Sequence, residues 1–386
     1  MRLQVRGNPS GVKGTIVGRV VRDARKLDEH SIVLVEDDFW MTSRSKEVSA
    51  VITTKDSPLP GFGAPTIYAV PALDHLDEGD LVSLDASGNV NTLYRVNSVH
   101  NAVLVTETCN SKCLMCSQPP KRNGDIAYLF DINRKLIPLI PKTCREITIT
   151  GGEPTLLGDA LFEMLRILVK ELPETEIHVL TNGRKFARMD FAAKLEGLET
   201  TRISFGVPLY SDYYGVHDYI VQAESAFNQT ILGLHNLARL RQRIELRVVL
   251  QKLTIERLEK LAHFIYKNLP FAEHVAFMAL ENIGFARYNS DLLWIDPCDY
   301  RELLSEAVLY LDSFGMNVSI FNHQLCTLPE ELWPFARKSI SEWKRIYLKE
   351  CAACGVRQRC GGFFESCRDL HSRGIHPIGH RIFDAS

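Results

Sequence analysis

Short apolar runs separated by turn residues fill the first hundred positions of the chain. The runs at 14–23 and 30–37 are rich in Val and Ile, and the segment at 57–65 is rich in Pro and Gly. Such runs with turn signals between them are typical of β-strands. Two further runs flank the sequence ASGN at 86–89, which favours a hairpin. We therefore predict a small β-rich domain over residues 1–100.

From residue 101 the pattern changes to apolar strands that alternate with amphipathic helices. Six strand-like runs are present, at 101–108, 145–150, 176–184, 201–207, 244–251 and 274–280. Helical spacing separates them, for example in the recurrence of Leu161, Leu165 and Leu168. This alternation predicts an α/β fold with a parallel sheet. Six units are too few for a closed eight-stranded barrel, so we expect a partial (β/α)6 barrel over 101–322, with functional groups at the carboxyl ends of its strands.

Composition and charge narrow the class of protein. The 386 residues carry 45 Lys and Arg against 47 Asp and Glu, a net charge of -2, which gives no general attraction to nucleic acids or anionic membranes. No stretch approaches 18 consecutive apolar residues, and the first residues lack the apolar core of a signal peptide. We expect a cytoplasmic protein. In that reducing compartment, ten cysteines indicate metal or redox chemistry more than disulfides.

Three cysteines occur together directly after the first strand of the predicted barrel. Cys109, Cys113 and Cys116 have the spacing C-x3-C-x2-C. Thiolates are the ligands of iron–sulfur clusters, and three of them can hold three irons of a [4Fe-4S] cluster while the fourth iron stays open. An open metal position is typical of a catalytic site. A structural zinc loop is the alternative.

A glycine-rich turn follows the second strand. In TGGEP, residues 150–154, Gly151 and Gly152 lack Cβ atoms and so permit close backbone approach, while Glu153 can accept hydrogen bonds from an ammonium group. Alone, such a turn is a weak signal. Together with the cysteine loop it resembles the motifs of the radical S-adenosylmethionine (radical SAM) superfamily. A branched side chain at Gly152 is then expected to weaken SAM binding without loss of iron.

The resemblance implies further contacts with SAM. Met115, just before Cys116, stands where family members offer a side chain to the adenine, although a gap-filling core methionine is the plain interpretation. Thr181 and Asn182 match a turn after the third strand that faces SAM or substrate. Ser204 matches a polar position at the end of the fourth strand. An ordinary turn or strand-end residue is the alternative for each of these positions.

The C-terminal segment carries a second group of cysteines. Cys351, Cys354 and Cys360 have the spacing C-x2-C-x5-C, which resembles the auxiliary cluster domains, called SPASM or twitch, that follow many radical SAM barrels. Either Cys326 or Cys367 could supply a further ligand. The segment has too few cysteines for the full SPASM pattern, so we expect one auxiliary [4Fe-4S] cluster, with a zinc site as the alternative.

The other cysteines and the last histidines carry no predicted function. Cys144 and Cys298 are interpreted as free, buried cysteines, which is also the default interpretation of Cys326. His371, His376 and His380 are interpreted as solvated residues rather than ligands.

A closer resemblance rests on three segments, at 100–120, 150–159 and 336–364. They are similar to the HxsC maturases of the His-Xaa-Ser peptide system. The resemblance implies a bacterial enzyme in which SAM is reductively cleaved and the 5'-deoxyadenosyl radical modifies a ribosomally synthesised peptide. It also implies a second, HxsB-like radical SAM protein and an electron donor as partners. The domains are then 1–100, 101–322 and an auxiliary cluster domain at 323–386.

Two rival functions fit parts of the same sequence. A radical SAM enzyme that acts on a small molecule or on tRNA would share every motif of the barrel. A non-enzymatic zinc or redox module would explain the cysteines alone, because C-x2-C pairs bind zinc equally well.

Overall fold

The computed structural model describes residues 4–23, 27–36, 48–59, 63–121, 125–198, 201–341 and 344–379. The chain forms two compact units. The first draws on Met1–Thr106, Gly124–Thr150 and Leu157–Ile177, and the second on Glu107–Asn123, Gly151–Leu156 and His178–Ser386. The domain boundaries expected from the sequence stay predictions.

The front of the chain is the β-rich region that the sequence predicts. Its eight strands are β1 (Gln4–Arg6), β2 (Asn8–Ser10), β3 (Ile16–Val21), β4 (Ser31–Val35), β5 (Ala50–Thr53), β6 (Thr66–Tyr68), β7 (Leu81–Leu84) and β8 (Asn89–Tyr94). They form one sheet in the order β1-β8-β7-β3-β4-β5-β6-β2. β7 and β8 pair antiparallel around the ASGN turn, which confirms the predicted hairpin.

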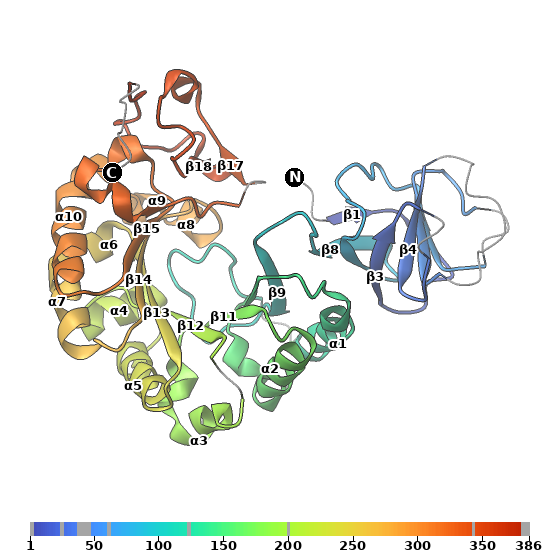
Figure 1. Cartoon of the computed structure of the whole chain (residues 1–386), viewed down its shortest axis with the longest axis horizontal. Helices are drawn as coiled ribbons and strands as arrows, with labels where there is room; N and C mark the ends of the chain where they lie inside the picture. Colours follow the sequence, from blue (N-terminus) through green and yellow to red (C-terminus); the bar gives the residue numbers. More distant parts are fainter. Residues whose placement is uncertain are drawn as a thin grey trace. The chain divides into compact units, whose positions relative to one another are not determined.

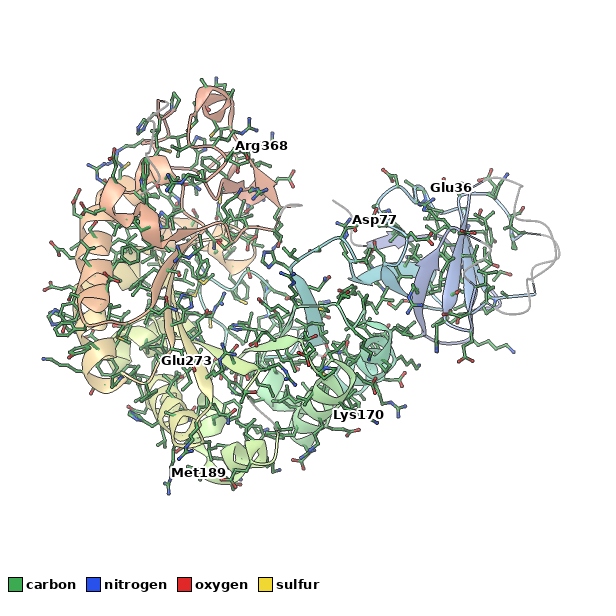
Figure 2. All side chains as sticks on the ribbon, viewed as in Figure 1. Glu36, Asp77, Lys170, Met189, Glu273 and Arg368 are labelled. Atoms are coloured by element: carbon green, nitrogen blue, oxygen red, sulfur yellow. The ribbon has the colours of Figure 1, made fainter. Side chains whose placement is uncertain are left out.

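An apolar core and a few polar contacts hold this sheet together. Buried Val, Ile and Leu side chains from seven strands belong to a single cluster: Val5, Val20, Ile32, Leu34, Ile52, Ile67, Val82, Leu84 and Val90. Between β6 and β7, Asp77 (labelled in Figure 2) forms an ion pair with Arg95 at 3.4 Å. The first unit also contains α1 (Ile126–Leu136) and α2 (Asp159–Glu171). Leu161, Leu165 and Leu168 of α2 are fully buried, as their helical spacing predicts.

A second sheet of eight strands contains the predicted barrel strands. They are β9 (Asn101–Thr106), β10 (Glu146–Gly151), β11 (Glu176–Leu180), β12 (Ile203–Pro208), β13 (Arg243–Leu250), β14 (His274–Ala279), β15 (Val318–Phe321) and β16 (Ala336–Arg337). The strand order β16-β15-β14-β13-β12-β11-β10-β9 follows the chain, and the pairs from β12 to β16 are parallel. The α/β class and the parallel sheet are confirmed. The expected number of six strands is wrong, because β15 and the short β16 extend the sheet.

Helices between the strands cover the outer face of the sheet in the second unit. They are α3 (Met189–Ala192), α4 (Tyr214–Val221), α5 (Ala226–Arg239), α6 (Lys252–Ile255), α7 (Leu258–Asn268), α8 (Phe285–Tyr288), α9 (Ser290–Leu293) and α10 (Pro297–Ser313). Figure 1 shows α5, α7 and α10 along the same side of β13–β15. Alternate residues of β13, from Ile244 to Leu250, are buried against these helices, while Glu245 and Arg247 face the other way.

The chain ends in a segment with little regular structure. A two-stranded antiparallel hairpin, β17 (Arg345–Ile346) with β18 (Phe363–Phe364), encloses Cys351, Cys354 and Cys360. Short 3-10 helices make up most of the rest, including η7 (Leu325–Thr327) and η9 (Lys349–Ala353). Within the described ranges, we find no helix with the length and apolar character that a membrane crossing requires.

Candidate functional site

Backbone hydrogen bonds join the cysteine loop to two other segments, the end of α4 and the start of α8. Lys112 and Leu114 donate to carbonyls at the end of α4, those of Val221 (3.1 Å) and Ile220 (2.9 Å). The carbonyl of Cys116 accepts from the amide of Phe285 at 2.8 Å. Nearby, Gly284 packs so closely on Cys116 and Ser117 that a Cβ atom would lie 2.6 Å from both of their carbonyl oxygens. The loop therefore has a fixed backbone that can present its three thiols.

Gly152 lies against the backbone of this same loop. A Cβ atom at Gly152 would overlap the carbonyl oxygen of Thr108 and lie 3.1 Å from the amide nitrogen of Cys109. The next residue, Glu153, donates its backbone amide to the Thr108 carbonyl at 2.9 Å. Gly151 has a φ of 144°, which favours glycine. The close approach expected at Gly152 is thus an approach to the cysteine loop itself.

Glu153 is buried and organises the turn that follows β11. Its Oε1 accepts from the Thr181 hydroxyl (2.6 Å) and from the Thr155 hydroxyl (2.6 Å), and its Oε2 accepts from the Asn182 amide (2.7 Å). The side chain of Asn182 donates to the Oδ1 of Asn110 in the cysteine loop at 2.6 Å. Glu153, Thr181 and Asn182, which the sequence singled out separately, therefore lie together beside the cysteines.

Arg184 is a residue of this site that the sequence interpretation missed. Its Nη1 donates to the carbonyl of Asn110 (2.8 Å) and to the hydroxyl of Ser111 (3.0 Å), and its Nε donates to Gln229 (2.7 Å). The guanidinium thereby pins the loop between its first two cysteines. The signal was present in LTNGR at 180–184, but an Arg in a turn is common on any protein surface.

Burial keeps the three thiols protonated when no metal is bound. Burial raises the pKa of Cys109 to about 11 and that of Cys113 to about 12, and the neighbouring thiols add to both shifts. The pKa of Cys116 is also raised by burial. Because thiols bind metal as thiolates, binding of a cluster here releases protons. No disulfide involves these residues, since all three are free.

An apolar cluster lies behind the loop and includes Met115. Its buried members are Met115, Tyr210, Ile220, Val221, Ala226, Ala286 and Leu293, with Cys113 and Leu114 packed against them. Met115 is 7% exposed. Met115 is therefore packed against apolar side chains, and a contact between Met115 and the adenine of SAM stays a prediction.

The structure places Ser204 at the second position of β12, four residues before the strand ends at Pro208. The expectation that it ends the strand is therefore wrong. Its hydroxyl lies 2.9 Å from the Nδ1 of His178 on β11. A contact between Ser204 and SAM stays a prediction.

Ser204 belongs to a polar network on the face of β11–β14 opposite the helices. Glu245 is the centre of this network: it accepts from the Nη1 of Arg247 (2.6 Å) and lies 2.8 Å from the Nδ1 of His274 and 3.6 Å from the Nε2 of His178. Burial alone would raise the pKa of Glu245, but the hydrogen bond with His274 and the charge of Arg247 outweigh it and lower the pKa to about 2. The side chain of Glu245 is 14% exposed, so this is a mostly buried ion pair.

Four cysteines of the C-terminal region surround one small cavity. Cys326 from η7 lines it together with Cys351, Cys354 and Cys360. Burial raises the pKa of Cys326 to about 11, and Cys360 and Cys351 add to the shift because they lie close by. Among the described residues, no three His, Cys, Asp or Glu side chains are spaced as ligands of a single metal ion.

Cys367 lies outside this group. It lines a different cavity, formed by residues such as Leu250, Ala279 and Asn322 at the carboxyl ends of β13, β14 and β15. Burial raises the pKa of the Cys367 thiol, which accepts a hydrogen bond from the backbone amide of Asn282. The structure thus separates the two cysteines that the sequence left as alternatives.

Two histidines of this segment are solvent-exposed, and one of them, His376, also lines the four-cysteine cavity. His371 and His376 are exposed, and their Nδ1 atoms lie 3.0 Å and 2.8 Å from the carbonyls of Arg368 and Gly374. His380 lies outside the described residues. The backbone amide of His376 donates to Cys326.

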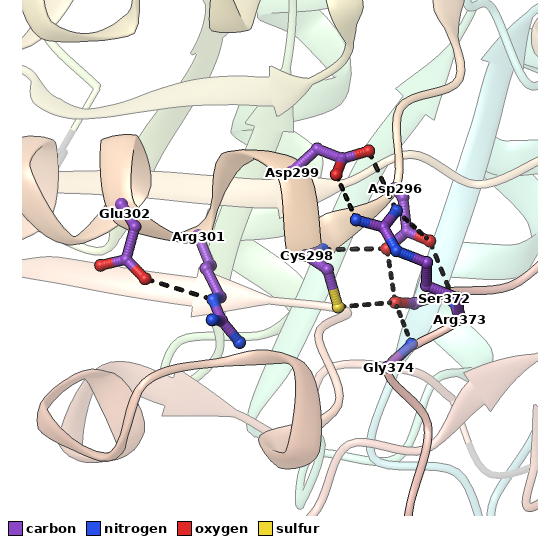
Figure 3. Close-up of polar contacts among 8 residues, drawn as sticks. All are labelled: Asp296, Cys298, Asp299, Arg301, Glu302, Ser372, Arg373 and Gly374. Carbon is purple, nitrogen blue, oxygen red and sulfur yellow. Dashed lines mark hydrogen bonds and ion pairs between the residues drawn. The ribbon is translucent and has the colours of Figure 1, made fainter.

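The end of the chain is anchored to the start of α10 (Figure 3). Asp296 caps this helix by accepting from the amide of Cys298 at 2.9 Å. The same carboxylate accepts from the Ser372 hydroxyl (2.5 Å) and the Arg373 amide (2.9 Å). Arg373 also forms an ion pair with Asp299. This anchor holds the segment that passes over the four-cysteine cavity.

Comparison with known families identifies the class of the domain. Residues 103–265 match the model of the Radical SAM superfamily. This range contains Cys109, Cys113, Cys116 and the turn Gly151–Glu153, so the superfamily predicted from those motifs is confirmed. The chain carries a radical SAM domain.

The curated relatives share one activity. The chain is 24% identical to the GTP 3',8-cyclase of Petrotoga mobilis over 275 residues, which cover 69% of this chain and 79% of the relative. It is 32% identical to the GTP 3',8-cyclase of Nitrobacter hamburgensis over 110 residues, 26% of this chain and 31% of the relative. That second match spans about a third of the relative's length.

Two solved structures are similar to parts of this chain. SuiB of Streptococcus suis matches with a TM-score of 0.47 and 18% identity, over 63% of this chain and 53% of SuiB. Native anSMEcpe with bound AdoMet and Cp18Cys peptide matches with a TM-score of 0.48 and 16% identity, over 72% of this chain and 91% of that chain. The chain spans about half the length of SuiB.

Proposed function

We propose that the chain is a radical SAM enzyme that modifies a ribosomally synthesised peptide of the His-Xaa-Ser type. The observation that carries the enzymatic part is the assembly around Glu153. One carboxylate joins the turn after β10 to the turn after β11, and Asn182 joins that turn to the cysteine loop. This arrangement supports a site in which a cluster and a small polar ligand are bound side by side.

The residues present fit a [4Fe-4S] cluster with SAM. Three free thiols stand on one rigid loop, and the donor set is the thiolate sulfur that such clusters use. Cys109, Cys113 and Cys116 would hold three irons, and the polar groups of Gly151–Glu153, Thr181 and Asn182 would face SAM. When bound, the cluster and SAM supply a 5'-deoxyadenosyl radical, which removes a hydrogen atom from the substrate.

The chain's own residues position these ligands and exclude water. Arg184 fixes Asn110 and Ser111, so the thiols of Cys109 and Cys113 keep their separation. The apolar cluster around Met115 and Tyr210 covers the other side of the loop and lowers the local polarity. The carboxylate of Glu153 already accepts four hydrogen bonds, so we assign it the role of holding the two turns in register.

The four-cysteine cavity supports a second, auxiliary cluster. Its thiols come from two separate segments and share one partly enclosed space. A zinc ion is the alternative occupant, because zinc also binds four thiolates. Iron, sulfide and zinc analysis of anaerobically purified protein decides between them.

The peptide substrate rests on the sequence resemblance to the His-Xaa-Ser maturases, with an electron donor and an HxsB-like protein as partners. A second candidate is a nucleotide substrate, because the curated relatives are GTP 3',8-cyclases. A tRNA substrate has less support, since the net charge is -2.

One experiment separates these candidates. The reduced protein is mixed with SAM and either the candidate peptide, GTP or no substrate, and 5'-deoxyadenosine and product masses are followed. The proposal expects more 5'-deoxyadenosine and a mass change only with the peptide. A product formed only from GTP would replace the peptide proposal by the cyclase one. Absence of 5'-deoxyadenosine in every arm, from protein with a full complement of iron, would contradict radical SAM activity.

A further inference from the structure

Four of the five cysteines in the C-terminal region face one cavity, and the fifth does not. Cys351, Cys354 and Cys360 come from the segment enclosed by β17 and β18, and Cys326 comes from the segment after β15. Cys367 follows Cys360 closely in sequence, yet it lines another cavity. Its thiol accepts a hydrogen bond from the backbone amide of Asn282. Of the two candidate ligands, Cys367 is therefore the nearer to Cys360 in sequence, but Cys326 is the one that shares its cavity.

The backbone on either side of Cys326 is fixed by hydrogen bonds. The side-chain Nε2 of Gln324 donates to the carbonyl of Gly362 at 2.7 Å, which ties the start of η7 to the hairpin. The indole of Trp333 donates to the carbonyl of Leu325 (3.1 Å), just before Cys326, and to that of Leu328 (3.3 Å), just after it. Gln324, Leu325 and Trp333 are all buried. Cys326 is thus held toward the cavity by groups that cannot easily rearrange.

The opposite wall of the cavity is ordered in the same way. The hydroxyl of Tyr347 donates to the carbonyl of Cys360 at 3.0 Å, and the guanidinium of Arg357 lies 4.7 Å from the centre of the Tyr347 ring. The amide of Ile378 donates to the thiol of Cys354 at 3.5 Å. Amide donors to sulfur stabilise thiolates, so this wall suits a thiolate-bound cluster.

We propose that Cys326 is the fourth ligand of the auxiliary cluster, which is therefore closed by four thiolates, and that Cys367 is not a ligand. This inference rests on the proposed function, which supplies the assumption that an auxiliary cluster is bound. A [4Fe-4S] cluster with a thiolate on every iron has no free position for a substrate atom. The auxiliary site then acts on the substrate only from a distance, or supports the fold, and direct binding of substrate to its iron is excluded.

The first test uses full-length protein in which Cys109, Cys113 and Cys116 are replaced by Ala, so that only the auxiliary site can hold iron. In this background Cys326→Ser and Cys367→Ser are compared by iron content and by electron paramagnetic resonance of the reduced protein. We expect Cys367→Ser to keep the iron and the spectrum. We expect Cys326→Ser to lose the cluster or to convert it to a three-iron form. The opposite pattern, or full four-iron spectra in both variants, would overturn the assignment.

A second test avoids the risk that Cys326→Ser fails to fold. Cluster-loaded wild-type protein and the same protein after iron removal are treated with iodoacetamide, and labelled peptides are quantified by mass spectrometry. Cys326 should be labelled at least tenfold more slowly in the loaded protein, whereas the rate at Cys367 should change little. Equal labelling of Cys326 in both states would overturn the proposal.

Closure itself is tested with cyanide, a small ligand for an open iron. In the variant that lacks the three loop cysteines, cyanide should leave the spectrum of the reduced auxiliary cluster unchanged. A new spectral species would show an open iron and contradict closure. None of these measurements uses a peptide, so a failure to modify peptides would leave the ligand assignment standing. Zinc in place of iron would refute the cluster part of the proposed function, and the labelling test would still decide the ligand set.

Discussion

A side chain at Gly152 would collide with the carbonyl oxygen of Thr108, the residue immediately before the first cysteine of the loop. The glycine therefore serves the contact between two backbone segments. This relationship changes the expectation drawn from the motif alone, which was that substitution would weaken SAM binding and spare the iron.

Gly152→Ala should displace the loop and reduce both iron and SAM cleavage. Because Thr108 is bonded to Glu153 and adjoins Cys109, it cannot move without shifting the first thiol. We expect about half of the total iron to be lost, with the auxiliary site still loaded. Gly14→Ala is the control, since the Cβ position there is open. Normal iron with weakened SAM binding would restore the original expectation.

Replacing Cys109, Cys113 and Cys116 together by Ala should abolish SAM cleavage and leave about half of the iron. The thiolates are the only protein ligands of the proposed loop cluster, whereas the C-terminal cysteines are untouched. Iron analysis and 5'-deoxyadenosine formation measure the two effects. Retained SAM cleavage would contradict the central assignment of the site.

Arg184→Gln should weaken the loop without removing a ligand. It removes charge-assisted bonds to Asn110 and Ser111, each worth about 1.5–3 kcal/mol. Iron should therefore pass to a chelator roughly tenfold faster or more, as followed by absorbance. Arg188→Gln is the matched control, because its ion pair with Asp190 is exposed. Equal iron release in the two variants would argue against the pinning role of Arg184.

Stability should depend on Glu245 in acid. Its pKa in the folded chain is about 2, below the ordinary value of 4.5. A lowered carboxyl pKa stabilises the fold above pH 4.5, by roughly 3 kcal/mol here, and this contribution is lost as the pH falls from 4.5 toward 2. Urea unfolding of metal-free protein should show Glu245→Gln less stable at pH 7 and the difference shrinking below pH 4.5. A difference that does not vary with pH would disprove the coupling.

The anchor at Asp296 should matter more than a surface ion pair on the same helix. The Asp296 side chain is 6% exposed, caps α10 and binds the segment around Ser372 and Arg373. Glu302 is 74% exposed and forms an ion pair with its neighbour Arg301 (Figure 3). Asp296→Asn should lower the free energy of unfolding by about 1–3 kcal/mol, and Glu302→Gln by less than 1 kcal/mol. Denaturant unfolding at neutral pH measures both.

The local motifs were readable in the sequence because their spacing reflects chemistry. The spacing of Cys109, Cys113 and Cys116 and the glycines of the turn at 151–153 indicate the same chemistry whatever the rest of the fold. The apolar runs that alternate with amphipathic helices predicted the parallel sheet. The position of Ser204 was wrong because an apolar run does not mark the end of a strand. The roles of Arg184 and Cys326 depend on contacts over long sequence distances, which one sequence does not record.

The same limit explains the extra strands of the second sheet. β15 is a four-residue run, VSIF, and β16 has two residues, so neither has enough length to show a period. β15 pairs parallel with the edge of β14, and β16 in turn pairs parallel with β15, so that each new strand satisfies backbone groups of the strand before it. Pairing of such short strands depends on the strands beside them in the folded sheet.

The anchoring of Ser372 and Arg373 to the cap of α10 bears on how such enzymes can be recombined. The last forty or so residues look like a module that evolution or an engineer could exchange between barrels. The residue that anchors them, however, lies outside the segment: Asp296, at the start of α10, accepts hydrogen bonds from Ser372 and Arg373. A chimera that carries this segment onto a barrel without an equivalent acid would inherit Cys351, Cys354 and Cys360 but lose the anchor that holds the segment in place.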